Sequence, residues 1–220
     1  MKRPYKLKVL KNEIEVSANH ITELFSKHEV YVFGYGSLLH SGGWALRFMT
    51  KPPAKEDLLE CTLNNFVRGP WGLFTTYLKF PSKAYYGIIR NACSETNGVI
   101  AKIHNKYDWV NLMTSEAVAG IGMYYNYRVV DVTEDIDKSS LLLPANAVIH
   151  AVVNEPINKV RSPFSMTPYK YYDAVWAGIQ KERSSEFVKR FLELGGFKNN
   201  EEVEALFLKQ RMEMANKTSK

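Results

Sequence analysis

A glycine-rich turn follows a strand-like segment near the start of the chain. Residues 30–33 are Val-Tyr-Val-Phe, a run typical of a buried strand, and residues 34–37 are Gly-Tyr-Gly-Ser. Glycine permits positive φ angles and leaves backbone N–H groups uncovered, so an anion or a carbonyl oxygen can approach closely. An ordinary glycine turn is the alternative, and a short pattern does not exclude it. We expect a ligand-binding turn formed by Tyr35, Gly36, Ser37 and Leu38.

A glutamate on an amphipathic segment is the second candidate. Residues 107–117 are predicted to form a short helix with Trp109, Leu112 and Glu116 at helical spacing, so that Leu112 and Glu116 share one face. A carboxylate on a face with large apolar side chains points toward the core or a cleft, where it can act as a general acid or base. A solvated helix glutamate is the alternative. Three rival acids lack this helix-face argument: Glu95, Asp108 and Glu155.

The histidines and cysteines favour neither a metal site nor a hydrolase. The five His residues lack a metal-ligand spacing such as HExxH, and Cys61 and Cys93 lack a CxxC spacing. We therefore predict no metal and no cofactor. Ser37 lies in Gly-Tyr-Gly-Ser, which differs from the G-x-S-x-G turn of serine hydrolases. Arg68 could bind a carboxylate through two nitrogens, but we interpret it as a loop residue before Gly69-Pro70.

The elements that position these residues are strands first and helices later, an order that indicates an α+β fold with a small sheet or barrel covered by helices. A polar turn at residues 91–97 is expected to separate two of the strands. Thr167-Pro168 is predicted to begin a helix, Ser184 or Ser185 a second one, and Asn200 a last one. The predicted strands are 31–35, 85–90, 98–103, 124–132 and 147–153.

Composition and length predict one globular domain with short additions. The 220 residues are 45% hydrophobic and 24% charged, which is usual for a soluble protein. We divide the chain into an N-terminal extension, a main domain, and a C-terminal helix with a basic tail: residues 1–29, 30–198 and 199–220.

The charge distribution does not predict a nucleic-acid partner. The net charge is +6, and much of the excess lies near the two ends of the chain. A nucleic-acid site would need a basic face with stacking aromatics, and most tyrosines fall in apolar patterns instead. No apolar run approaches the ~20 residues that span a bilayer, so no membrane partner is expected. Two cysteines without a disulfide framework suit a reducing compartment, and a cytoplasmic location is expected. The oligomeric state cannot be predicted.

Two further motifs accompany the Gly-Tyr-Gly-Ser turn and Glu116: Gly122-Met123-Tyr124, and Ser162-Pro163 followed by Tyr169 and Tyr171. In this order, the four motifs resemble the γ-glutamylcyclotransferase superfamily over roughly residues 30–195. Val-Phe-Gly-Tyr-Gly-Ser-Leu is similar to the family's Tyr-Gly-Ser loop, especially in its glutathione-specific ChaC-like branch. Glu116 is similar to the acidic residue of the Leu-Asp-x-x-Glu-Gly segment, although Met113 and Ala117 replace Asp and Gly. Gly122-Met123-Tyr124 resembles the Gly-Met-Tyr that leads the next strand. The late Pro-Ser-x-x-Tyr region is similar to Ser162-Pro163 followed by Tyr169 and Tyr171.

The resemblance implies a small mixed β-barrel flanked by helices, with C-terminal helices. It also implies a lyase that converts a γ-glutamyl amide to 5-oxoproline and a free amine, amino acid or peptide. Glu116 would be the catalytic residue of such an enzyme. The substrate-binding residues would be Tyr35, Gly36, Ser37, Leu38, Tyr124, Tyr125 and Tyr169, with only one of Tyr124 and Tyr125 expected to face the pocket.

The implied chemistry needs little from the protein. The α-amine of the substrate can attack its own γ-carbonyl and close a five-membered ring, so neither a protein nucleophile nor water is required. One carboxylate can accept the ammonium proton and return it to the leaving amine. The alternative is a non-catalytic protein that binds a small ligand in the same pocket, because Met113 and Ala117 depart from the family pattern. The leaving group cannot be named from the sequence.

Overall fold

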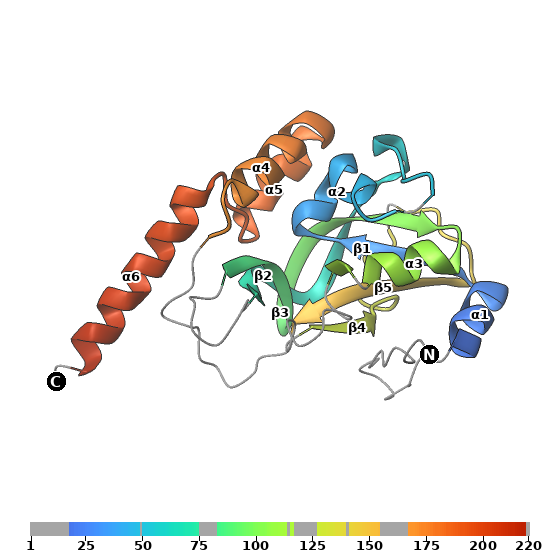
Figure 1. The fold of residues 1–220 in the computed structure, drawn as a ribbon, viewed down its shortest axis with the longest axis horizontal. Coiled ribbons are helices and arrows are strands. Elements are labelled where there is room, and N and C mark those ends of the chain that lie inside the picture. Colours follow the sequence, from blue (N-terminus) through green and yellow to red (C-terminus); the bar gives the residue numbers. More distant parts are fainter. Residues whose placement is uncertain are drawn as a thin grey trace, which may run out of the picture.

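The computed structural model describes residues 18–48, 50–74, 83–113, 115–116, 127–139, 141–154 and 167–218. Its strands form one mixed sheet with the order β2-β3-β1-β5-β4 (Figure 1). β1 and β5 are parallel, with Val30 opposite Val148, and the other neighbours are antiparallel. The strands are β1 (Glu29–Gly34), β2 (Leu59–Phe74), β3 (Lys83–Ile103), β4 (Tyr127–Asp131) and β5 (Ala147–Asn154).

The sheet curls until its two edges meet. Beyond β4, Ile136 forms a bridge to Leu63 of the edge strand β2. Two backbone hydrogen bonds support the bridge, from Asn64 N to the Asp135 carbonyl at 2.8 Å and from Asp137 N to the Thr62 carbonyl at 2.9 Å. Such closure covers strand edges that would otherwise expose unpaired backbone groups. The predicted α+β fold with a small mixed barrel is confirmed as a curled, partly closed sheet with helices.

Helices flank the sheet, some of them before or between its strands in sequence and the others after the last strand (Figure 1). The first half of the chain contributes α1 (Ala18–Lys27), the 3-10 helix η1 (Gly36–Leu39), α2 (Ser41–Ala45), the 3-10 helix η2 (Lys55–Asp57) and α3 (Lys106–Met113). The last third contributes α4 (Tyr171–Glu182), α5 (Ser185–Glu193) and α6 (Asn200–Thr218). In Figure 1, α6 runs outward from the rest of the described fold.

The predicted polar turn at residues 91–97 is wrong. These residues belong to β3, which pairs with β2 from Lys83 to Ile100 through a ribbon interrupted by bulges. Residues 95–97 pair with residues 62–64 of β2, whereas residues 91–94 form a bulge between the pairs Asn64–Glu95 and Phe66–Arg90. Cys93 has a positive φ of 62°, and residues 90–93 are exposed, so polar side chains there face solvent. Polarity in this segment therefore reflects exposure of the ribbon rather than a break in the strand.

Arg68 is a core residue rather than the loop residue that we predicted. Its side chain is buried in β2 and donates to Asn97 at both the side-chain oxygen and the backbone carbonyl. The guanidinium carbon lies 4.6 Å from the centre of the Phe191 ring. Burial lowers the pKa of Arg68 to about 10. Arg68 therefore ties β2 to β3 and α5 and does not line the pocket described below.

The helix caps were predicted with mixed success. Ser184 caps α5, because its side chain accepts a hydrogen bond from Phe187 N at 3.1 Å. The predicted start at Thr167-Pro168 is wrong, since α4 begins at Tyr171 after Lys170, which adopts a left-handed φ of 52°. The predicted cap Asn200 is the first residue of α6, and its side-chain oxygen accepts from Tyr172 N at 2.9 Å, which joins α6 to α4.

Candidate active site

The glycine turn leaves the centre of the sheet and bends sharply. β1 lies between β3 and β5, and its residues 30–34 are buried. Tyr35 then donates its hydroxyl to the Val152 carbonyl of β5 at 2.5 Å. Gly36 has a φ of 66°, and a Cβ there would lie 2.8 Å from the Tyr171 hydroxyl oxygen. Only glycine adopts this conformation without strain and also leaves that space open.

Helix α2 packs directly on the turn through its backbone. A Cβ at Gly43 would overlap the Ser37 carbonyl, so glycine is required for the close approach. The buried Trp44 donates its indole N–H to the Leu38 carbonyl at 2.6 Å. The turn and α2 are thus one packed unit, and this unit carries Arg47 shortly after the helix ends.

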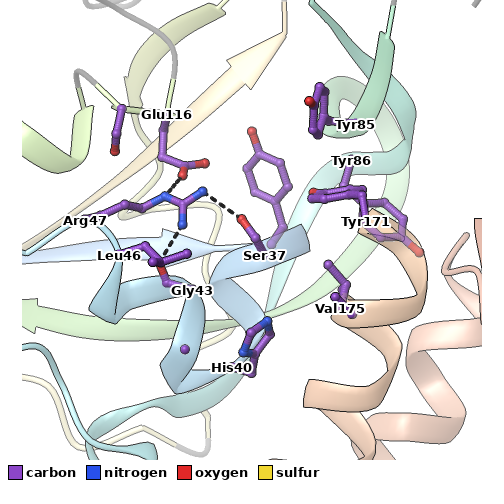
Figure 2. A pocket seen from close by; sticks show the side chains of 14 residues that line it. Ser37, His40, Gly43, Leu46, Arg47, Tyr85, Tyr86, Glu116, Tyr171 and Val175 are labelled. Atoms are coloured by element: carbon purple, nitrogen blue, oxygen red, sulfur yellow. Dashed lines mark hydrogen bonds and ion pairs between the residues drawn. The ribbon is translucent and has the colours of Figure 1, made fainter. Parts of the chain in front are cut away.

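Arg47 joins the turn to Glu116 (Figure 2). Its guanidinium donates from Nε to Glu116 Oε1, from one terminal nitrogen to the Gly43 carbonyl at 2.5 Å, and from the other to Ser37 Oγ at 3.0 Å. The side chains of Arg47 and Glu116 are 18% and 17% exposed. The Arg47 backbone is also held, because Asn111 of α3 donates its amide to the Arg47 carbonyl at 2.5 Å. The pair is therefore fixed from two elements and still faces open space.

Glu116 reaches this position because α3 packs its apolar face into the core. Trp109 and Leu112 are buried, as the helical spacing predicted. Ser115 and Glu116 lie in a further helical turn just beyond α3, where Ser115 Oγ donates to the Leu112 carbonyl at 2.9 Å. Glu116 thus projects from the end of a buried helix into a pocket instead of into bulk solvent.

The pocket has a volume of about 500 Å³ and two unlike sides. Figure 2 shows the ion pair with Ser37 on one side and the tyrosines on the other. Tyr85 of β3 and Tyr171 of α4 meet edge to face, with ring centres 4.9 Å apart. The other residues of this side are Tyr86, Ala174 and Val175. The arrangement offers charge and hydrogen bonds at one end and aromatic surface at the other.

His40 lines the pocket beside α4. Burial lowers the pKa of His40, while the nearby Glu182 carboxylate opposes that shift. The net direction favours the neutral imidazole at pH 7. His40 therefore adds hydrogen-bonding capacity to the pocket without adding a fixed positive charge.

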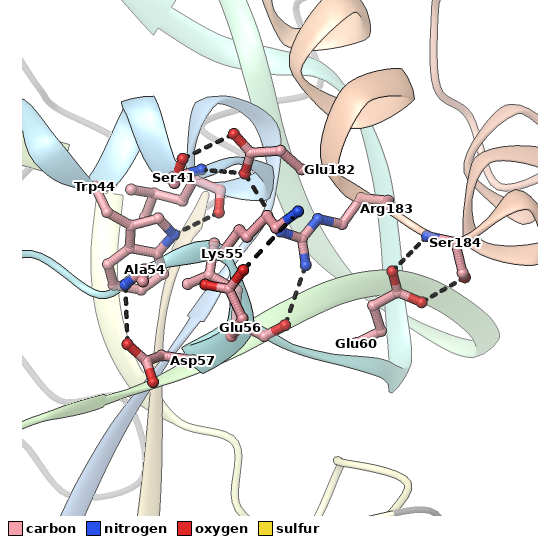
Figure 3. Close-up of polar contacts among 12 residues, drawn as sticks. Ser41, Trp44, Ala54, Lys55, Glu56, Asp57, Glu60, Glu182, Arg183 and Ser184 are labelled. Atoms are coloured by element: carbon pink, nitrogen blue, oxygen red, sulfur yellow. Dashed lines mark hydrogen bonds and ion pairs between the residues drawn. The ribbon is translucent and has the colours of Figure 1, made fainter.

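A carboxylate clamp holds the two walls of the pocket together (Figure 3). Glu182, at the end of α4, accepts hydrogen bonds from Ser41 N and Ser41 Oγ of α2, both at 2.7 Å. Next to it, Arg183 donates to the Leu58 carbonyl at 3.0 Å. Because Arg47 follows α2 and Tyr171 begins α4, this clamp sets the distance between the charged and aromatic sides.

The structure brings some of the predicted site residues together. Tyr35, Ser37 and Glu116 line one pocket, whereas Gly36 and Leu38 are buried within the turn behind it. Tyr169 is 86% exposed and is not among the lining residues, but Tyr171 is. Tyr124 and Tyr125 lie outside the described residues.

The lining residues that the sequence reasoning did not name as site residues include Arg47, His40 and Tyr85. Arg47 and His40 lie between the predicted strands 31–35 and 85–90, and no motif marks them. Tyr85 was assigned to a strand, and a strand places alternate side chains on opposite faces, so one of Tyr85 and Tyr86 could have been predicted to face a pocket. Their shared feature is proximity to the turn, which only the fold reveals.

The described residues contain no group of three His, Cys, Asp or Glu side chains close enough to hold a metal ion. The same part of the chain has no helix that is both long and apolar enough to cross a bilayer. The charged side chains that line the pocket among these residues are Arg47 and Glu116.

Comparison with known proteins finds similar solved structures but no matching sequence family. The sequence matches no family model and no curated protein. A solved γ-glutamyl cyclotransferase is 17% identical, with 81% of this chain and 98% of that chain covered and a TM-score of 0.43. The YkqA protein of Bacillus subtilis is 17% identical, with 81% and 60% covered and a TM-score of 0.44. An uncharacterized protein from Homo sapiens is 16% identical, with 80% and 96% covered and a TM-score of 0.42.

One of these similar structures is thus a γ-glutamyl cyclotransferase, the family whose motifs the sequence resembles. At these identities the likeness concerns the fold. The roles of individual residues depend on the geometry of the pocket itself.

Proposed function

We propose that the protein is a γ-glutamylcyclotransferase-type lyase that acts on a small γ-glutamyl compound. The observation that carries this proposal is the meeting of Ser37 and Glu116 in one pocket, linked by Arg47. A turn with open N–H groups and a carboxylate are the two features that intramolecular ring closure needs. The sequence motifs around both residues resemble those of the same family.

The reaction divides between the substrate and these residues. Glu116 accepts a proton from the α-ammonium, and the freed amine attacks the γ-carbonyl carbon. As the ring closes, negative charge develops on the carbonyl oxygen, which the backbone N–H of Ser37, a lining residue at the start of η1, would stabilise. The bond from the γ-carbon to the leaving nitrogen then breaks as Glu116 returns the proton to that nitrogen. The ring nitrogen, which still carries two hydrogens after the attack, gives up one of them as a proton through the freed Glu116 carboxylate to solvent. The products are 5-oxoproline and a free amine, and no water is consumed.

The pocket favours the folded substrate that this reaction requires. Ring closure is fast only when the amine lies within about 3–3.5 Å of the carbonyl carbon, which gives a large effective concentration. A pocket of about 500 Å³ with a charged end and an aromatic end can hold the glutamyl group at one side and the leaving group at the other. The leaving group would then contact Tyr85, Tyr171 and Val175.

A non-catalytic binding protein is the second candidate, and the Arg47–Glu116 ion pair favours it. The Arg47 guanidinium already engages Glu116 Oε1, and an oxygen engaged in this way is not open to accept a proton from a substrate. Met113 and Ala117 also depart from the motif around the family's catalytic glutamate. Such a protein would use the same pocket to hold or sense a small γ-glutamyl ligand.

A substrate panel separates the two candidates. The purified chain would be incubated with γ-glutamyl anilide, γ-glutamyl amino acids, γ-glutamyl amines and glutathione, and 5-oxoproline would be quantified by mass spectrometry. The lyase predicts release of 5-oxoproline with at least one compound. Saturable binding of a compound without release of 5-oxoproline would instead support the binding protein.

A further inference from the structure

The Arg47–Glu116 pair retains unused hydrogen-bonding capacity on its pocket side. A guanidinium has five N–H donors, and Arg47 uses three of them on Glu116, Gly43 and Ser37. Among the described residues, none accepts from the other two. Glu116 accepts through Oε1, and within the same part of the chain no donor reaches Oε2. The pair therefore presents two donors and one acceptor oxygen side by side.

An α-amino acid head group carries the complementary charges at matching positions. Its carboxylate and ammonium are attached to one carbon, so any site for them must offer a cation and an anion next to each other. A planar guanidinium suits a carboxylate, and a carboxylate oxygen suits an ammonium. Because Arg47 and Glu116 are already neutralised by each other, a ligand that is neutral overall leaves the net charge of the pocket unchanged.

The rest of the described lining fixes the orientation. Arg47 is the permanent cation among these lining residues, since burial disfavours the charged form of His40. Tyr85, Tyr171 and Val175 lie on the other side of the pocket, where they offer no charge. An amino acid head at Arg47 therefore directs its side chain toward the aromatic side (Figure 2).

We propose that the Arg47–Glu116 pair is the recognition site for a zwitterionic α-amino acid head group. Arg47 binds the α-carboxylate through its remaining N–H donors, and Glu116 Oε2 accepts from the α-ammonium. The identification of this head group as that of a γ-glutamyl compound rests on the proposed function. The contact also places the α-ammonium next to Glu116, which accepts its proton during ring closure. It also makes Arg47 a specificity-determining residue, which selects compounds with a free α-carboxylate.

The test measures binding with a ligand that cannot cyclise. S-phenyl-L-homocysteine has the amino acid head and replaces the amide with a thioether. Its dissociation constant would be measured by calorimetry beside those of its decarboxylated and deaminated forms. For the wild type, each deletion should weaken binding on the order of 10- to 100-fold, the scale of a charge-assisted hydrogen bond.

Variants assign the effect to the pair. In Arg47→Gln, ligands with and without the carboxylate should bind equally within about twofold, while Arg47→Lys should keep part of the preference because it retains a point charge. Arg90→Gln is the matched control, since Arg90 is an exposed arginine on β3 paired with Asp135 at 3.0 Å. The control should keep the full preference. An undiminished preference for the carboxylate in Arg47→Gln would overturn the proposal.

A second measurement covers the case in which Arg47→Gln does not fold. In a crystal structure of the wild type with S-phenyl-L-homocysteine, the ligand carboxylate should lie within hydrogen-bond distance of the Arg47 guanidinium, and a carboxylate bound elsewhere would refute the proposal. Turnover is a separate readout. Zwitterion selectivity that depends on Arg47, without 5-oxoproline release, would support this site and reject the lyase. Release of 5-oxoproline, together with a preference for the carboxylate that is unaffected in Arg47→Gln, would support the lyase and reject this recognition site.

Discussion

Single residues around the turn are constrained by space as well as by chemistry. Gly36 combines a positive φ with a close approach to Tyr171 and Tyr86, so the turn has no room for a side chain. Ser37, in contrast, uses its side chain in one hydrogen bond accepted from Arg47 at 3.0 Å. The backbone of the turn, more than its side chains, therefore shapes the pocket.

This difference predicts a steep contrast between neighbouring variants. Gly36→Val would place a β-branched residue at a φ of 66° and push against the Tyr171 hydroxyl oxygen, so we expect turnover to fall by roughly 100-fold or more. Ser37→Ala removes one hydrogen bond and should reduce kcat/KM by less than about 10-fold. Initial rates of 5-oxoproline release check both variants. Equal losses in the two would show that the backbone is not the determining feature.

The two tyrosines of the late motif are predicted to behave differently. Tyr171 lines the pocket, so Tyr171→Ala should raise KM roughly 10-fold through lost aromatic burial. Tyr169 is 86% exposed, and Tyr169→Ala is the matched control, with kinetics near those of the wild type. Steady-state kinetics on the best substrate of the panel separate them. A larger effect of Tyr169→Ala would show that Tyr169, rather than Tyr171, contacts the substrate.

At the level of elements, the pocket depends on how α4 and α5 are held against the sheet. Glu182 clamps α4 to α2, and the next junction is also capped, since Glu60 of β2 accepts from Ser184 N at 2.8 Å and Ser184 Oγ at 2.6 Å (Figure 3). The same hydroxyl accepts from Phe187 N and so begins α5. One serine therefore joins a strand to two helices.

Loss of that cap should destabilise the fold by about 1 kcal/mol, the usual cost of a missing N-cap. Ser184→Ala removes both the acceptor for Phe187 N and the donor to Glu60. Ser185→Ala, at the first residue of α5, is the control and should change the free energy of unfolding by less than about 0.5 kcal/mol. Urea denaturation measures both values. A stable Ser184→Ala variant would mean that the cap contributes little.

For the molecule as a whole, a buried histidine makes stability depend on pH. His150 of β5 accepts a hydrogen bond at Nδ1 from the Trp109 indole N–H at 3.2 Å, which requires that nitrogen to be unprotonated. Burial lowers the pKa of His150 to about 4 from an ordinary value of 6.5. Trp109 also belongs to the helix that carries Glu116 toward the pocket. Protonation of His150 would therefore disturb the support of the site.

The direction of the pH effect follows from proton binding in the two states. Between pH 6.5 and about 4 the unfolded chain binds more protons at His150 than the folded chain, so the free energy of unfolding falls as the pH falls. The contribution of this group is roughly 3 kcal/mol over that window and is constant above it. His150→Asn cannot titrate, so its stability should fall less steeply in the same range. Parallel pH curves for the two proteins would contradict this assignment.

The sequence predicted the fold class and part of the site, because those depend on local patterns. The β1 run with its glycine turn, the apolar face of α3 and the Ser184 cap can each be read from a few neighbouring residues. Glu116 was found in this way, since its spacing from Leu112 follows the buried face of α3.

Other features depend on long-range contacts and could not be predicted. Polar residues 95–97 belong to a strand because residues 62–64 of β2 pair with them, and Arg68 is buried because Asn97 and Phe191 surround it. Arg47 reaches the site because α2 packs on the turn through Gly43. In each case the deciding partner is distant in sequence, and local composition suggests a loop.

The role of Glu116 as the proton carrier is tested most directly by Glu116→Gln. This change keeps the shape of the side chain and removes its basic oxygen. We predict that 5-oxoproline release falls by at least ~100-fold, the scale of general acid–base catalysis, while the deaminated thioether ligand, whose carboxylate faces Arg47, still binds. Glu95→Gln is the control, because Glu95 of β3 forms an ion pair with Arg190 at 2.7 Å and does not line the pocket. Near wild-type release of 5-oxoproline by Glu116→Gln would contradict the account.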